Sequence, residues 1–113
     1  PSEGSFDLDS YIDYLIEFLE EVGRGAHMLA VCQPSVPAYA AVALMNADKH
    51  PCTPKSLTMM GGPIDTREAP TDVNTLATER PHAWFQQNVI ATVPGIYPGG
   101  GRKVYPGFLQ LAG

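Results

Sequence analysis

The sequence predicts an α/β fold organised around a parallel sheet. Two short apolar runs, residues 27–31 and 56–60, have the length of buried strands, and the alanine-rich stretch between them has the composition of a helix that packs against a sheet. An amphipathic pattern precedes the first run. The order helix, strand, helix, strand is typical of a βαβ unit, in which a helix crosses between two parallel strands.

The first predicted helix covers residues 8–22. Asp7 or Asp9 can cap its start, and Gly23 is suited to end it. Its apolar residues recur at the spacing of one helix face: Leu8, Ile12, Leu15, Ile16, Leu19 and Val22.

A second helix is predicted between the two strands. Residues 27–31 are apolar without alternation, which indicates a strand buried on both faces. Pro34 and Pro37 are tolerated only in the first turn of a helix, and Ser35 can contribute a cap there. The body of the helix is therefore expected at residues 38–47. The second apolar run is interpreted as another buried strand.

The character of the chain changes after residue 65. Many of the 11 glycines and 11 prolines lie in this part. Short helices are predicted at residues 71–78 and 81–91, followed by a loop at residues 97–107. We expect residues 66–113 to begin an insertion over the sheet, without further strands.

The composition excludes several classes of protein. The formal net charge is −5 and only seven residues are basic, whereas a nucleic-acid partner requires clustered Lys and Arg. No apolar run approaches the roughly 18 residues that span a bilayer. Two cysteines are too few for a disulfide scaffold, and free thiols fit a reducing cytoplasm. No metal-ligand spacing or nucleotide-binding glycine pattern is present, so no metal and no cofactor are expected.

Cys32 lies at the corner between the first strand and the second helix. In a nucleophile elbow with the pattern G-x-S-x-G, the same five places here read Ala-Val-Cys-Gln-Pro, residues 30–34. A thiol attacks an ester as thiolate, and the positive end of the following helix favours a thiolate. The backbone N–H of Gln33 would face the developing oxyanion. On local sequence, the alternative is that Cys32 is a small buried core residue.

Three separated blocks of the sequence carry a family resemblance. They read VCQP with AAVALM at residues 31–34 and 40–45, MGGPIDTR at residues 60–67, and VYPGFLQL at residues 104–111. In this order they resemble the intracellular poly(3-hydroxybutyrate) depolymerases, which are α/β-hydrolases with a cysteine nucleophile. The resemblance implies that Cys32 is that nucleophile.

The resemblance also implies a domain organisation. Residues 1–65 would form a core segment of the α/β-hydrolase parallel sheet with its nucleophile elbow, and residues 66–113 would begin a mostly helical or irregular lid. The catalytic aspartate and histidine of the family would lie after Gly113. We therefore expect the chain to be a fragment that lacks both residues and is inactive by itself.

The implied function is hydrolysis of ester bonds in a storage polyester, poly(3-hydroxybutyrate), through an acyl-thioester on Cys32. The expected partners are the polymer or its oligomers and the granule surface in the cytoplasm, with no nucleic acid and no membrane span. Two alternatives stand beside it. The first is a polyester synthase, whose cysteine lies in a pattern similar to G-x-C-x-G-G. Ala30 and Pro34 do not match the glycines of that pattern. A non-enzymatic granule-binding module is the other alternative.

Overall fold

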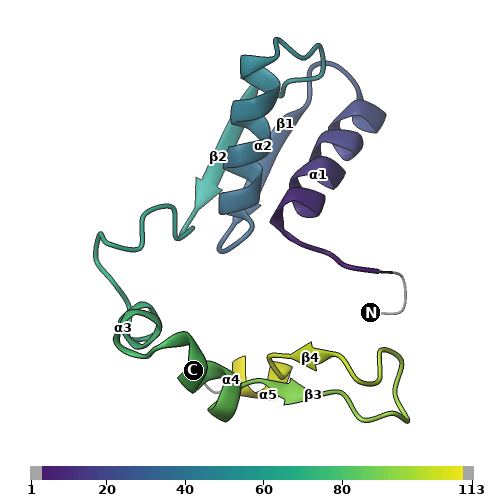
Figure 1. Ribbon diagram of the computed structural model, residues 1–113. Coiled ribbons are helices and arrows are strands. Elements are labelled where there is room, and N and C mark those ends of the chain that lie inside the picture. The colour runs from purple at the N-terminus through teal and green to yellow at the C-terminus, as the bar shows by residue number, and fades with distance from the viewer. Residues whose placement is uncertain (1–3, 111–113) are drawn as a thin grey trace. The chain divides into compact units, whose positions relative to one another are not determined.

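The structure is a computed structural model that describes residues 4–110. These residues divide into two units, residues 6–65 and residues 66–110 together with residues 4 and 5 (Figure 1). Each unit has its own helices and its own two-stranded sheet. The predicted mixture of helices and strands is therefore confirmed, and the sheets are small. Along residues 4–110, no helix is both long enough and apolar enough to cross a membrane.

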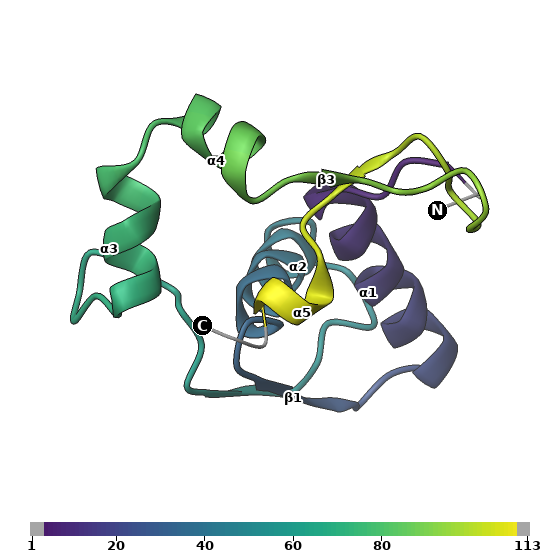
Figure 2. The ribbon, with the colours of Figure 1, turned by 90° about the horizontal axis from the view of Figure 1, so that it is seen from below.

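The unit formed by residues 6–65 is a helix followed by a βαβ arrangement. Its elements, in chain order, are α1 (Leu8–Val22), β1 (His27–Val31), α2 (Ser35–Ala47) and β2 (Ser56–Met60). The two strands pair in parallel, with His27 opposite Ser56 and Val31 opposite Met60. Both helices lie on the same face of this sheet (Figures 1 and 2). The predicted order of elements and the parallel pairing are confirmed.

Helix α1 begins and ends at the predicted residues. The carboxylate of Asp7 accepts hydrogen bonds from the Ser10 N–H at 2.9 Å and from the Ser10 hydroxyl at 2.8 Å. At the other end, Gly23 has a φ of 88°, which a residue without a Cβ adopts readily, and its N–H donates to the Leu19 carbonyl. Local capping chemistry therefore determines both ends of α1.

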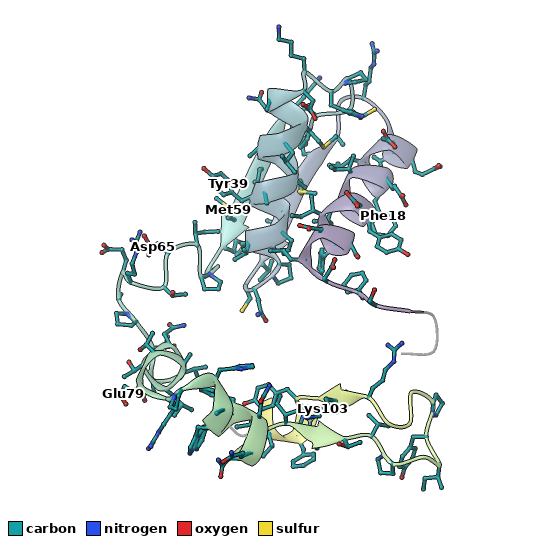
Figure 3. All side chains as sticks on the ribbon, viewed as in Figure 1. Phe18, Tyr39, Met59, Asp65, Glu79 and Lys103 are labelled. Atoms are coloured by element: carbon teal, nitrogen blue, oxygen red, sulfur yellow. The ribbon has the colours of Figure 1, made fainter. Side chains whose placement is uncertain are left out.

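The apolar face of α1 differs in part from the prediction. Ile12 and Leu19 are buried, but Leu8 and Val22 at the two ends are exposed. Three aromatic residues, Phe6, Tyr14 and Phe18, form an exposed row of rings with centroids about 6 Å apart. Phe18 projects from the side of α1 that faces away from α2 (Figure 3). Only the middle of the predicted stripe packs against α2.

The hydrogen bonds to Asp7 make the stability of α1 depend on pH. The bonds from the Ser10 N–H, and next from the Ser10 hydroxyl, hold the pKa of Asp7 below its ordinary value of 3.8. A carboxyl group whose pKa is lower in the folded state stabilises the fold above about pH 4, and this contribution is lost as the pH falls through the lowered value.

We expect the variant Asp7→Asn to lose less stability on acidification than the unaltered protein. Asparagine caps helices about as well as aspartate, and it does not titrate in this range. The measurement is the urea midpoint of unfolding at about pH 6 and at a series of pH values below 3.8, the range in which the capping carboxylate becomes protonated. Asp13→Asn removes a carboxylate from the same helix without touching the cap and is the control. An equal acid loss in Asp7→Asn and in the unaltered protein would contradict the proposed capping effect.

Helix α2 begins at Ser35, so Pro37 lies in its first turn, as predicted, ahead of the alanine-rich body at residues 38–47. Pro34 stands at its cap position and already has helical backbone angles, with φ −55° and ψ −14°. Ser35 does not cap the helix, which corrects the prediction. Its hydroxyl instead donates to the Ala30 carbonyl oxygen at 3.3 Å, and its side chain is fully buried. The helix therefore joins β1 through its first residue.

The strands are less buried than predicted. Side chains alternate between the two faces of a strand, and the helices cover only one face of this sheet. In β1, Ala30 is buried, but Leu29 and Val31 are 63% and 53% exposed. Met60 in β2 is 52% exposed. The expectation of strands buried on both faces is therefore wrong within residues 6–65.

The second unit contains three helices and a hairpin within residues 66–110. They are α3 (Asp72–Glu79), α4 (His82–Asn88), β3 (Ala91–Thr92), β4 (Lys103–Val104) and α5 (Gly107–Gln110). The side chain of Thr71 accepts a hydrogen bond from the Asn74 N–H, and the side chain of Asn74 accepts one from the Thr71 N–H. This capping box determines the start of α3.

Two predictions for this unit are corrected. Helix α4 ends at Asn88 and does not extend to residue 91, because Ala91 and Thr92 pair antiparallel with β4. The predicted loop at residues 97–107 therefore contains a strand. The turn of this hairpin is tight: a Cβ on Gly100 would lie 2.8 Å from the Gly95 Cα. The expectation that this part holds no strand is wrong.

Candidate active site

The corner between β1 and α2 holds Cys32 in an unusual backbone conformation. Its φ is 62°, in the left-handed region that residues with a Cβ adopt at a cost of about 1–3 kcal/mol. The Cys32 N–H donates to the Met60 carbonyl at 2.7 Å, and the Cys32 carbonyl accepts from the Ser35 N–H at 3.0 Å. These bonds anchor the corner to β2 on one side and to α2 on the other.

The Cys32 side chain is exposed. This exposure does not fit the alternative that Cys32 is a buried core residue. The sharp strand-to-helix turn instead presents the thiol at the carboxyl end of β1 and beside the first turn of α2. The position is chemically suited to a nucleophile, and the catalytic role of Cys32 stays a prediction.

Gln33 follows the corner with its backbone N–H available. Its carbonyl accepts from the Val36 N–H at 3.1 Å. Its own N–H takes part in none of the hydrogen bonds found among residues 4–110. A free N–H on the residue after a nucleophile is the donor that an oxyanion hole requires. The predicted oxyanion role of Gln33 is compatible with this geometry and stays a prediction.

An apolar groove lies beside the corner, within residues 6–65. Its volume is about 320 Å³. The residues that line it include Leu8, Tyr11, Gln33, Pro34, Pro37 and Pro63. Such a groove can hold an apolar ligand while the neighbouring thiol remains reachable.

Both histidines of this unit lie far from Cys32 along the fold. His27 begins β1, whereas Cys32 follows its end, and the His27 Nδ1 is 2.8 Å from the Ser56 hydroxyl. His50 follows α2 and forms a contact of 2.9 Å with the Glu20 carboxylate. Each histidine thus has a structural partner. Within residues 6–65 the structure brings no histidine to the thiol.

The other thiol lies in the loop between α2 and β2. Cys52 is half-buried, and its N–H donates to the His50 Nδ1 at 3.2 Å. Cys32 and Cys52 are both free. Over the described part of the chain, no group of three or more His, Cys, Asp or Glu side chains is arranged to hold a metal ion.

Sequence reasoning missed Gly62, which closes the corner from the other strand. A Cβ on Gly62 would overlap the Ser35 Cβ and Oγ and would lie 3.0 Å from the Cys32 carbonyl oxygen. The local signal was the pair Gly61-Gly62 directly after β2, which indicates either a turn or a close approach of the backbone. Only the fold reveals which residues it approaches.

Comparison with known proteins identifies the second half of the chain. Residues 61–113 match the family described as PHB de-polymerase C-terminus. This part of the chain is similar to the PHB depolymerase family. The family resemblance predicted from the sequence is thereby confirmed, and it indicates a role in PHB degradation. No curated protein and no solved structure matches the chain.

The matched segment begins at Gly61, immediately after β2. It includes Gly62 and Pro63, which border the corner and the groove, and it does not include Cys32. The similarity to PHB depolymerases therefore covers residues 61–113 and does not include the corner that carries Cys32.

Proposed function

We propose that the protein hydrolyses ester bonds of poly(3-hydroxybutyrate) through an acyl-thioester on Cys32. The observation that carries this proposal is an exposed thiol held at a φ of 62° on a strand-to-helix corner, in a chain with a PHB depolymerase segment. A residue kept in a costly conformation at such a corner is typical of a nucleophile elbow.

The proposed reaction has two steps. The Cys32 thiolate attacks an ester carbonyl carbon, and the oxygen that becomes negative accepts a hydrogen bond from the Gln33 N–H. The C–O bond then breaks, the alcohol end leaves with a proton, and the acyl part remains on sulfur as a thioester. Water attacks this thioester, releases the acid and regenerates the thiol.

A base must move the protons in both steps. His27 and His50 are held by Ser56 and Glu20 at the other end of the unit, so we assign this task to neither of them. We propose that the base and its orienting carboxylate lie outside residues 4–110, as the family resemblance implies. The hydrolase-type sheet to which β1 and β2 would belong is part of the same proposal.

The apolar groove is the proposed place for the polymer beside the scissile ester. Its lining is dominated by proline, leucine and tyrosine side chains, which match the methyl-bearing backbone of the polyester. We further propose that residues 66–113 begin a lid over this site and that the protein works at the surface of cytoplasmic polyester granules. No cofactor takes part in this mechanism.

The acyl-thioester can be tested directly. A protein that includes the proposed base is mixed briefly with a 3-hydroxybutyrate oligomer and quenched in acid, and the masses of its peptides are measured by mass spectrometry. We expect a hydroxyacyl adduct on the peptide that contains Cys32 and none on the peptide that contains Cys52, because only Cys32 lies at the corner. Hydrolysis without any adduct on Cys32, under conditions that trap other thioesters, would contradict the proposal.

A further inference from the structure

Ser35 connects both sides of the corner that carries Cys32. Its hydroxyl donates to the Ala30 carbonyl, which lies two residues before Cys32, at 3.3 Å. Its N–H donates to the carbonyl of Cys32 itself at 3.0 Å. The Ser35 side chain is fully buried, so no water competes for the bond to Ala30. Ser35 therefore closes the turn, and it has no contact with substrate in the proposed reaction.

Gly62 covers this buried serine from the end of β2. There is no room for a side chain at this position, because a Cβ would overlap the Ser35 Cβ and Oγ. The same Cβ would also come within 3.0 Å of the Cys32 carbonyl oxygen. Gly62 does not need glycine for its backbone angles, since its φ lies outside the left-handed region. Glycine is required here only because no side chain fits between the backbone of residue 62 and Ser35.

We propose that Ser35 and Gly62 are positioning residues that hold Cys32 in its left-handed conformation. That conformation is unfavourable for cysteine, so contacts on the corner must stabilise it. The hydrogen bonds of Ser35 close the turn, and Gly62 keeps Ser35 in place by packing directly on it. The catalytic consequence rests on the proposed function, whereas the effect on the Cys32 conformation does not.

The first test is the alkylation rate of each cysteine by iodoacetamide, measured by peptide mass spectrometry. We expect Gly62→Ala to slow alkylation of Cys32 by about 3- to 10-fold, because relief of the overlap displaces the corner and reduces access to the exposed thiol. Cys52 lies in another loop and serves as an internal reference whose rate should stay unchanged. Gly107→Ala is the matched control, since a Cβ there meets nothing within 4 Å.

The second test is hydrolysis of 3-hydroxybutyrate oligomers by the same variants, made in a protein that includes the proposed base. We expect Gly62→Ala to lower kcat by about 10²-fold with little change in KM, because a displacement of about 1 Å at a nucleophile has an effect of this size. The double variant Gly62→Ala with Ser35→Gly removes the overlapping atoms and should recover part of both the alkylation rate and kcat. Ser35→Ala leaves the packing intact and removes only the bond to Ala30, so it tests the idea even if Gly62→Ala does not fold.

The outcomes separate this proposal from the proposed function. Equal slowing of Cys32 and Cys52 in Gly62→Ala would indicate general loosening and would overturn the positioning role. Unchanged Cys32 alkylation in both Gly62→Ala and Ser35→Ala would overturn it as well. If Cys32→Ala retains hydrolysis, the proposed function fails, while the alkylation rates of Cys32 still decide whether Ser35 and Gly62 position it.

Discussion

Replacing Cys32 by alanine in a protein that includes the proposed base should lower the release of 3-hydroxybutyrate from amorphous granules by at least about 10³-fold, the scale on which loss of a nucleophile acts. Alanine cannot form the acyl-thioester, so only substrate binding and the Gln33 N–H would remain. The protein should stay folded, because the Cys32 side chain is exposed and its removal leaves no cavity. Circular dichroism of the variant should therefore match that of the unaltered protein.

Cys52→Ala is the matched control for this experiment. It removes the only other thiol in the chain, and that thiol lies in a half-buried loop away from the corner. We expect its release rate to stay within about two-fold of the unaltered protein, as for most substitutions outside an active site. Undiminished release by Cys32→Ala would assign the chemistry to another nucleophile. Granule binding by Cys32→Ala, with no release by any variant or by the unaltered protein, would favour the non-enzymatic alternative.

The corner shows what the sequence can predict about a site and what it cannot. The residues before and after Cys32 indicate a strand-to-helix turn, because apolar runs and early-helix prolines are local signals. The φ of 62° at Cys32 and the packing of Gly62 on Ser35 arise only when β1 and β2 pair. A pattern that lacks the flanking glycines of the elbow therefore still folds into such a corner.

The ends of elements were predictable wherever they depend on nearby residues. Asp7 and Gly23 mark α1, and both strands of the parallel sheet have the predicted bounds. The first turn of α2 was predicted to hold Pro34 and Pro37, and Pro37 lies in it. Pro34 instead stands before the helix with helical angles and leaves Ser35 as the first helical residue and not as a cap. Local signals thus predict the presence of a helix more reliably than the residue at which it begins.

Features that depend on distant pairing were not predictable. The hairpin of β3 and β4 has only two residues in each strand, and its partners lie apart in the chain. The exposure of Leu29 and Val31 likewise depends on which face of the sheet the helices cover (Figure 2). The apolar sequence of a strand does not indicate which face that is. Burial was therefore the least accurate part of the sequence interpretation.

The buried side of α2 holds in place the helix that begins at the corner. Met45 is 2% exposed and Ala41 is fully buried, so this side of α2 is the centre of the core of residues 6–65. We expect Met45→Ala to lower the free energy of unfolding by about 2–5 kcal/mol, because it removes buried side-chain volume and leaves a cavity. The measurement is urea unfolding followed by circular dichroism of the helices.

Leu44→Ala is the matched control for this loss of volume. Leu44 is the neighbour of Met45 on the same helix and is 50% exposed, so its truncation should change the free energy of unfolding by less than about 1 kcal/mol. Equal effects of the two substitutions would contradict the assignment of Met45 to the core. Because α2 carries Ser35 at its first turn, Met45→Ala should also raise the fraction of molecules in which the corner is open. Alkylation of Cys32 in increasing urea would detect this opening at a lower concentration than in the unaltered protein.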